Sequence, residues 1–379
     1  MAYDKVVDSA SLDSKLTQVA DAIRTKGNTG ADLQFPSGFI SAIQAIQTGV
    51  ELKIIVSVTS GAAVTATKGS KVVSGTSVNG TCTLIVPEAG TWSVSAKLGI
   101  QTSDTQMVSL ADEYSATLLF LGPLNDNDWE TIRSVSDAGQ GANYWSVGDR
   151  KAVTLNGTVG ALTLSNFTTY AFIIGFNHNS SLEGTNRIHF QLAKDALSGG
   201  TDVCFCDSSY NSTVSVTGYF SMNSSQTAVG GWESSQMRTS ICGTSLSSYA
   251  GTIIAIIPEA LRAVLKSVTK YTDNMGNGDP TASAITATTD YFFLLSEYEV
   301  FGRNARANTN EGTKQAQYTY YSAGNSKIKY KHSATSTDAD WWSRSPLSGS
   351  TMQFVLESGQ NPVFERANYS LGFAPGFCV

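Results

Sequence analysis

The sequence WWSRSP at residues 341–346 is the stretch that decides the fold of this 379-residue chain. Two adjacent Trp side chains carry a large apolar area, so one of them is expected in a core. The neighbouring Arg344 is expected to pair with a buried carboxylate or with loop carbonyl groups, because a guanidinium binds both in a fixed geometry. The segment therefore predicts a rigid scaffold that holds display loops in place.

The composition is that of a β-rich, loop-rich protein. Charged residues make up only 15% of the chain, whereas globular proteins average about 25%. The net charge of −6 argues against a nucleic-acid partner, because nucleic acids select basic surfaces. One basic stretch, with Lys314, Lys327, Lys329 and Lys331, is expected to be a solvated strand face.

The N-terminal sequence has no apolar segment typical of a secretory signal, and no run of about 18 apolar residues occurs. The chain is therefore expected to be made in a cytoplasm without membrane insertion. The five cysteines are expected to be reduced and mostly buried. Cys204 and Cys206 are too close for an ordinary mutual disulfide, and no second cluster could complete a zinc site.

Residues 1–49 are predicted to be a helical attachment or oligomerisation segment. Residues 9–27 form one amphipathic pattern, and a second, shorter helix follows residues 35–37. Two short helices bury too little surface alone, so they are expected to dock onto copies of themselves, as a homotrimer, or onto a partner. The alternative is packing on the following domain. The apolar faces comprise Leu12, Leu16, Val19, Ile23, Phe39, Ile40, Ile43 and Ile46.

Residues 50–122 are predicted to be a small β-sandwich that acts as a spacer. Their turn pattern resembles immunoglobulin-like and carboxypeptidase-regulatory modules. Gly122-Pro123 marks the next boundary. The alternation of apolar residues indicates strands at 52–58, 63–68, 81–86, 91–98 and 114–120.

Residues 123–379 are predicted to be the main domain. Pro258 at a first turn, with Leu261, Val264, Leu265 and Val268 on one face, predicts a helix that ends at Lys270. A loop is expected from Tyr271 to Ala287. Strands are expected at 151–155, 170–176, 188–192, 253–257 and 291–295.

Two resemblances extend this interpretation. The run from Ala22 to Phe39 resembles the N-terminal segment of tail and prophage proteins of Gram-positive hosts. The second resemblance rests on seven segments of the main domain. They are NYWSVGD (143–149), IGFNHN (174–179), GWESSQMR (231–238), FLLSE (293–297), VFG (300–302), WWSRSP (341–346) and GFAPGFCV (372–379). Together they resemble a bacterial and phage family with a C-type-lectin-like α+β fold, which includes the variable proteins of diversity-generating retroelements. The formylglycine-generating enzymes, which resemble this family in fold, use a reactive cysteine pair that no cysteine arrangement here provides.

The resemblance implies that the C-terminal loops bind a ligand. Ser343 replaces the Leu common in relatives, and residues 350–369 lack the Asn, Ser and Asp runs of many relatives. An AAC or AAT template codon cannot become a Met, Gln or Glu codon by changes at adenines alone, because those codons end in a purine. Either other template codons were used or the protein is not diversified by a retroelement. The expected ligand-binding residues are Ser350, Thr351, Met352, Gln353, Gln360, Pro362, Phe364, Glu365, Asn368 and Tyr369.

Two of these residues, Phe364 and Tyr369, are expected to be exposed anchors, because a few aromatic side chains carry most of the energy of an interface. The alternative is that Phe364 fills the core of a β-hairpin. The resemblance also implies that the last strand returns beside the first strand of the domain. Phe377 and Val379 should then face the core, with Cys378 on the other side.

No catalytic residue, metal site or cofactor is expected. His178, Asn179, Glu183 and His189 are interpreted as structural, since two histidines eleven residues apart with one carboxylate between them are a weak signal. Glu297 and Glu299 have strand spacing and are expected on one face, where a solvated or Arg-paired edge is favoured over a hydrolase pair. No nucleophile elbow, phosphate loop or EF-hand occurs.

The expected function is therefore host attachment. The chain is expected to be a receptor-binding protein of a phage tail tip or fibre, located in the virion with other tail proteins. It would bind a bacterial surface protein or glycan through its C-terminal loops. The alternative is a cell-wall or glycan hydrolase on the same scaffold.

Overall fold

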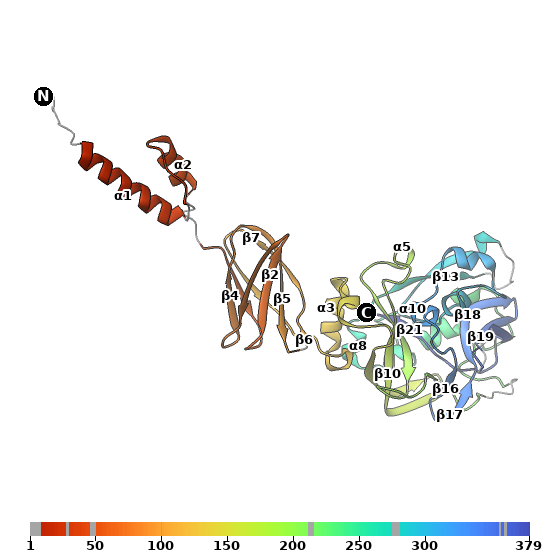
Figure 1. Ribbon diagram of the computed structural model, residues 1–379. Helices are drawn as coiled ribbons and strands as arrows, with labels where there is room; N and C mark the ends of the chain where they lie inside the picture. The colour runs from red at the N-terminus through yellow and green to blue at the C-terminus, as the bar shows by residue number, and fades with distance from the viewer. Residues whose placement is uncertain are drawn as a thin grey trace. The chain divides into compact units, whose positions relative to one another are not determined.

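A computed structural model describes the chain except for residues 1–8, 28–29, 46–50, 100, 211–215, 275–280, 356–357 and 360–361. The chain divides into two compact units, residues 1–120 and 121–379 (Figure 1). The second unit begins close to the boundary that Gly122-Pro123 predicts. None of the helices in the described ranges is both long and apolar enough to cross a membrane.

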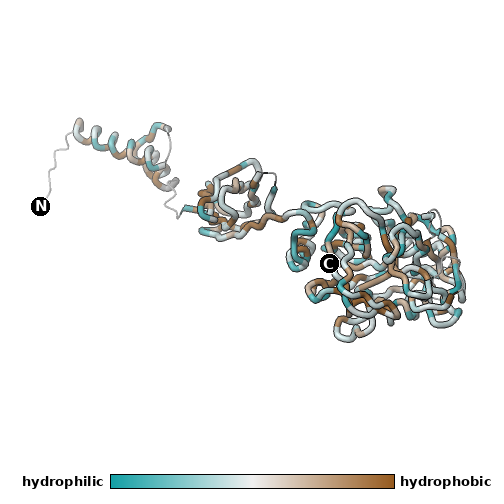
Figure 2. The backbone as a smooth tube through the Cα atoms, turned by 90° about the horizontal axis from the view of Figure 1, so that it is seen from below, coloured by the Kyte–Doolittle hydropathy of each residue, from teal (hydrophilic) through white to brown (hydrophobic). Residues whose placement is uncertain are grey.

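The two predicted N-terminal helices are present as α1 (Ser9–Gly27) and α2 (Ser37–Ala45). Ala20, Ile23 and Phe39 form a small buried cluster between them. Apolar residues recur along both helices (Figure 2), and four of them lie outside this cluster. Ile46, predicted on the same face, lies outside the described residues. The side chains left about half exposed are Leu12, Val19, Ile40 and Ile43.

The rest of the first unit is a two-sheet β structure, as predicted. One sheet has the order β4-β1-β8, and the other has the order β3-β2-β5-β6 with β7 beside β5. Trp92, Val64 and Ile54 come from both sheets and share one core. The strands are β1 (Lys53–Ser57), β2 (Ala63–Lys68), β3 (Lys71–Thr76), β4 (Thr81–Ile85), β5 (Gly90–Leu98), β6 (Gln101–Thr102), β7 (Gln106–Leu110) and β8 (Glu113–Thr117).

Three strands of this unit, β3, β6 and β7, were not predicted. No residue of β3 is buried, so its sequence carries no apolar alternation. The two residues of β6 are both exposed. β7 buries only Val108 and Leu110, which is too short a pattern to predict a strand.

The second unit is built around an antiparallel sheet with the order β15-β21-β11-β10-β9. Every residue of the central strand β11 is buried, because the sheet is covered on both faces. α3 (Trp129–Asp137) begins at Asp128, whose side chain accepts a hydrogen bond from the backbone N–H of Thr131. The strands are β9 (Arg150–Val159), β10 (Leu162–Phe176), β11 (Ile188–Lys194), β15 (Phe292–Phe293) and β21 (Gly376–Cys378).

Smaller sheets and short helices complete this unit. Its remaining sheets are β12-β16-β17, β13-β14 and β18-β19-β20. These strands are β12 (Val203–Cys204), β13 (Val268–Asp273), β14 (Ile285–Asp290), β16 (Lys329–Lys331), β17 (Ala334–Ala339), β18 (Trp341–Ser348), β19 (Thr351–Val355) and β20 (Pro362–Arg366). The remaining helices are η1 (Leu124–Asp126), α4 (Gly141–Tyr144), α5 (Ser180–Glu183), α6 (Gly231–Ser234), η2 (Met237–Cys242), α7 (Ile253–Ile256), α8 (Glu259–Arg262), η3 (Ala282–Ala284), α9 (Glu297–Phe301), η4 (Thr309–Thr313) and α10 (Thr319–Ser322).

The segment from 253 to 287 corrects three predictions. The strand predicted at 253–257 is the helix α7, since a short apolar run fits a buried helix as well as a strand. The helix predicted to reach Lys270 ends at Arg262, and Val268-Thr269 begins β13 instead. β-branched residues favour a strand there. Much of the loop predicted from Tyr271 to Ala287 belongs to β13 and β14.

The C-terminal residues lie in the core, as predicted. Phe377, Cys378 and Val379 are fully buried, and the ring of Phe377 stacks on Phe190 at 5.2 Å between centroids. The prediction that the last strand returns beside the first strand of the domain is wrong. β21 pairs with β11 and β15, whereas the first strand of the unit, β9, forms the opposite edge of the sheet.

The cysteines are free and buried, as expected. The basic stretch differs from its prediction at Lys329, which is fully buried rather than solvated. Its ammonium group lies 5.0 Å from the ring centroid of Trp341 and 3.9 Å from Asp202 Oδ2. Burial lowers the pKa of Lys329 to about 8.

Candidate functional site

The scaffold segment predicted at 341–346 forms most of β18. Trp341 and Trp342 are both fully buried, and each indole N–H is paired. Trp341 Nε1 donates to the carbonyl of Lys327 at 3.0 Å, and Trp342 Nε1 donates to the carbonyl of Phe220 at 2.8 Å. Both hydrogen bonds connect β18 to other segments of the second unit, which contain Lys327 and Phe220.

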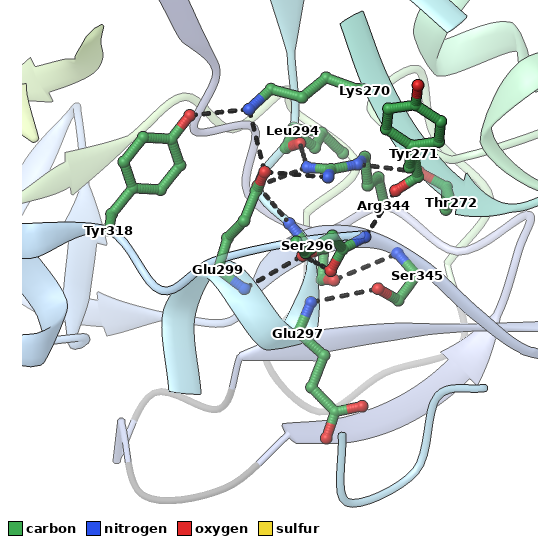
Figure 3. Close-up of polar contacts among 12 residues, drawn as sticks. Lys270, Tyr271, Thr272, Leu294, Ser296, Glu297, Glu299, Tyr318, Arg344 and Ser345 are labelled. Carbon is green, nitrogen blue, oxygen red and sulfur yellow. Dashed lines mark hydrogen bonds and ion pairs between the residues drawn. The ribbon is translucent and has the colours of Figure 1, made fainter. Parts of the chain in front are cut away.

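Arg344 pairs with a buried carboxylate, as the sequence predicted. Its two terminal nitrogens donate to the two carboxylate oxygens of Glu299, with Nη2 at 3.0 Å from Oε1 (Figure 3). Its Nε donates to Thr272 Oγ1 at 2.9 Å, and Nη1 also donates to the carbonyl of Leu294 at 2.8 Å. The guanidinium thus joins β18 to β13, to α9 and to the chain after β15.

Lys270, which the sequence did not single out, is the second buried cation of this network. Its Nζ donates to Glu183 Oε2 at 2.7 Å, to Glu299 Oε1 at 2.9 Å and to Tyr318 OH at 2.8 Å. Its side chain and the two carboxylates are all buried. Lys270 therefore has three partners, the number of hydrogen bonds that an ammonium group can donate.

Burial and ion pairing act in opposite directions on the two carboxylates. Burial raises the pKa of Glu183 to about 7, although Lys270 opposes this effect. Burial alone would raise the pKa of Glu299 too, but Arg344 and Lys270 outweigh it and hold that pKa well below its usual range. At neutral pH Glu299 is the permanent anion of the network, and Glu183 is close to its titration midpoint.

Two histidines lie beside the carboxylates. The ring of His178 stacks on Tyr318 at 3.7 Å, and Nδ1 of His189 lies 3.2 Å from Tyr318 OH. Burial lowers the pKa of His178 to about 3 and that of His189 well below its usual value, so both are neutral. This packing agrees with the structural role predicted for them.

One group within the described ranges could in principle hold a metal ion. His178, Glu183 and Glu299 offer ligand atoms that lie within 4.8 Å of one another. The ammonium of Lys270 lies within hydrogen-bonding distance of both carboxylates. It therefore takes the place that a cation would need, and the sequence-based expectation of no metal site remains our interpretation.

Glu297 and Glu299 do not share a face, which corrects the strand-spacing prediction. Both lie on the helix α9, which begins with a capping box between Ser296 and Glu299. Residues two positions apart on a helix point in different directions. Glu299 faces Lys270 and Arg344, whereas the carboxylate of Glu297 accepts backbone N–H groups of residues 305–307.

The predicted ligand-binding residues are split between core and surface. Phe364 is 40% exposed, as predicted, whereas Tyr369, which was also predicted to be exposed, is half-buried. Met352 and Pro362 are buried, so we remove them from the candidate surface. The side chain of Gln353 and all of Gln360 lie outside the described residues. The remaining half-buried members are Ser350, Thr351, Glu365 and Asn368.

Sequence reasoning missed Arg306, which lies over the ring of Phe364 at 5.4 Å from its centroid. Arg306 follows α9, more than fifty residues before Phe364, and no periodic pattern connects the two. A second pair lies nearby in sequence, with Arg366 5.7 Å from the ring centroid of Tyr369. The candidate surface therefore consists of the outer side of β20 and the loop that carries Arg306.

Comparison with known proteins covers only part of the chain. Residues 212–379 match the model of a family described as "Domain of unknown function (DUF6273)". This matched segment includes Lys270, Glu299, Arg344 and the sheet β18-β19-β20. No curated protein sequence matches the chain.

Proposed function

We propose that the protein is a receptor-binding protein of a phage tail tip or fibre. In this proposal the second unit is a C-type-lectin-like domain that binds a bacterial surface ligand, and the β-sandwich is an immunoglobulin-like spacer. The observation that carries the proposal is the exposed ring of Phe364 on a strand whose supporting sheet is fixed by buried polar contacts. Rigid aromatic side chains are effective binding anchors because little entropy is lost on binding.

The buried network supports this proposal by fixing β18. Arg344 and the two indole groups connect β18 to five other segments. β18 pairs with β19, and β19 pairs with β20, so the position of Phe364 follows from that of β18. A preorganised surface of this kind is what adhesion to a fixed ligand requires.

The N-terminal helices support attachment and self-association. Leu12, Val19, Ile40 and Ile43 expose apolar side chains that a neighbouring copy or another tail protein would cover. A homotrimer within a virion tail would bury them and present several copies of the binding unit. Multivalent display strengthens attachment without new contacts.

The hydrolase alternative receives less support from the same residues. A glycosidase needs two carboxylates that reach the scissile bond. Glu297 and Glu299 are both fully buried, and their oxygens are bound to backbone N–H groups or to cations. We therefore favour binding over hydrolysis as the function of this unit.

Cell binding tests the proposal. Fluorescently labelled full-length protein is incubated with cells and purified cell walls from a panel of Gram-positive bacteria. We expect retention on part of the panel without release of soluble wall fragments, and loss of retention in a Phe364→Ala, Glu365→Ala, Tyr369→Ala variant. Tyr114→Ala is the matched control, since Tyr114 is 41% exposed in the first unit. Retention of the triple variant at the level of the control, failure of the wild type to bind any member, or release of fragments contradicts the proposal.

A further inference from the structure

The loop that carries Arg306 is held by a buried carboxylate. Glu297 is fully buried, and its Oε1 accepts the N–H of Ala305 at 2.6 Å while its Oε2 accepts the N–H of Ala307 at 2.8 Å. The N–H of Arg306 lies 3.2 Å from Oε1. Three consecutive backbone groups are thus fixed by one side chain, so the start of the Arg306 side chain has a defined position.

Two arginines and two aromatic rings alternate on the candidate surface. Phe364 and Arg366 are exposed at alternate positions of β20, so both point to the same side of the strand. Arg306 is exposed and lies over Phe364, and Arg366 lies over Tyr369. The described residues therefore form two guanidinium–ring pairs, Arg306 with Phe364 and Arg366 with Tyr369.

The charge of this surface is opposite to that of the whole chain. The chain carries a net charge of −6, whereas the described part of this surface presents Arg306 and Arg366. Glu365 lies between Phe364 and Arg366 on β20, so its side chain points to the other side of the strand. A ligand with negative groups would meet an electrostatically complementary surface.

We propose that the ligand is an anionic carbohydrate, and that Arg306 and Arg366 select it. Carboxylate or phosphate groups of the carbohydrate pair with the guanidinium groups, whose fork of donors fits both anions. The apolar C–H face of a sugar ring packs on Phe364 between them. This inference rests on the proposed binding function of the surface and adds the chemical class of the ligand.

An acidic peptide fits the surface less well than a carbohydrate. β20 is an edge strand, to which an extended peptide would add by pairing with backbone N–H groups. Pro362 has no N–H, and the N–H of Arg366 is taken by Glu365. Both features protect the edge against strand addition.

A binding array tests the ligand class. Full-length protein is applied to immobilised polygalacturonate, phosphomannan, neutral dextran and poly(glutamate). We expect binding to the two anionic polysaccharides, weakening with added NaCl, and little binding to the other two probes. Arg306→Gln and Arg366→Gln should each weaken binding by up to about fivefold, the upper end of the range for an exposed ion pair. Lys97→Gln, which removes an exposed charge from the first unit, should leave binding unchanged.

Several outcomes would overturn the inference. These are equal binding to dextran, preference for poly(glutamate), absence of binding to both anionic polysaccharides, or anionic binding that both Arg variants retain in full. Cell binding separates this failure from that of the proposed function. If Phe364→Ala removes cell binding while both Arg variants keep it, the ligand class is wrong and the binding surface stands. If Phe364→Ala binds cells normally, the surface itself is wrong.

Discussion

Arg344 and Lys270 place two cations in the interior of the second unit, and Glu299 accepts hydrogen bonds from both. Such a network contributes to stability only while it is complete, because desolvation of each charge is costly. The network also determines which strands and helices of the second unit pack against one another. Without Arg344, β18 would lose its direct contacts with Thr272 and Leu294.

Removing one partner of this network should therefore be severely destabilising. We expect Arg344→Met to lower the free energy of unfolding of the second unit by about 3–5 kcal/mol, since Glu299 remains as a partly uncompensated buried charge. Denaturant unfolding followed by Trp fluorescence measures this loss. The Glu299→Gln, Arg344→Met double variant should be less destabilised than the sum of the single variants. A loss below about 0.5 kcal/mol, the usual surface value, would contradict the account.

The raised pKa of Glu183 predicts a pH dependence. Its pKa in the folded state is about 7, above the ordinary value of 4.5, so the folded state binds more protons between these values. Stability contributed by this group is present below pH 4.5 and is lost as the pH rises to about 7. Glu183→Gln removes this dependence.

The stability of Glu183→Gln relative to the wild type should accordingly increase as the pH rises from about 4.5 to 7. Denaturation midpoints of the two proteins measured side by side test the sign, because the two proteins differ only at Glu183. A difference that is constant with pH, or one that falls, would show that Glu183 ionises normally in the folded protein.

For single residues, the sequence predicted an interaction correctly where a buried side chain has few possible partners. A guanidinium next to two Trp residues has to be paired when it is buried, so the carboxylate partner of Arg344 was predictable. The identity of that partner was not, because Glu299 is 45 residues away and no local pattern marks it. Lys270 was missed because it was assigned to the end of a helix, although it lies on β13.

At the scale of elements, long alternating patterns predicted strands well, and short apolar runs did not. β9, β10 and β11 contain the strands predicted at 151–155, 170–176 and 188–192, each of which buries several residues, but β9 and β10 extend well beyond these bounds. The run Ile253–Ile257 has no flanking signal that separates helix from strand. In the structure Arg262 donates hydrogen bonds to the carbonyls of Ile254 and Ile257, at 2.9 and 3.0 Å, and no sequence pattern reveals these contacts.

The last strand, β21, supplies a prediction at this scale. Phe377 contacts Phe190, Trp129 and Phe292, so its burial is worth about 1.5–3 kcal/mol. Deleting residues 377–379 should lower the melting temperature of the second unit and leave that of the first unit unchanged. Differential scanning calorimetry of the full chain resolves both transitions. An unchanged transition of the second unit would contradict the placement of β21 between β15 and β11 in the sheet.

At the scale of the whole molecule, the exposed apolar side chains of α1 and α2 predict self-association. The full chain should form a trimer in solution, and a truncated chain that begins at Glu51 should be monomeric. Light scattering gives both masses. Replacing Ile40 and Ile43 by Ser should weaken the trimer, because these two side chains are about half exposed in a single copy. Equal, monomeric masses of the full and truncated chains would contradict this prediction.

The central claim is that the outer side of β20 is the surface that contacts the bacterial cell. Hydroxyl-radical footprinting of the full-length protein, free and bound to cells that retain it, tests this claim directly because aromatic side chains are oxidised when solvent reaches them. The account predicts that binding protects Phe364 and Tyr369 from oxidation, whereas Tyr114 in the first unit remains as reactive as in the free protein. Protection of Tyr114 with unchanged oxidation of Phe364 would contradict it.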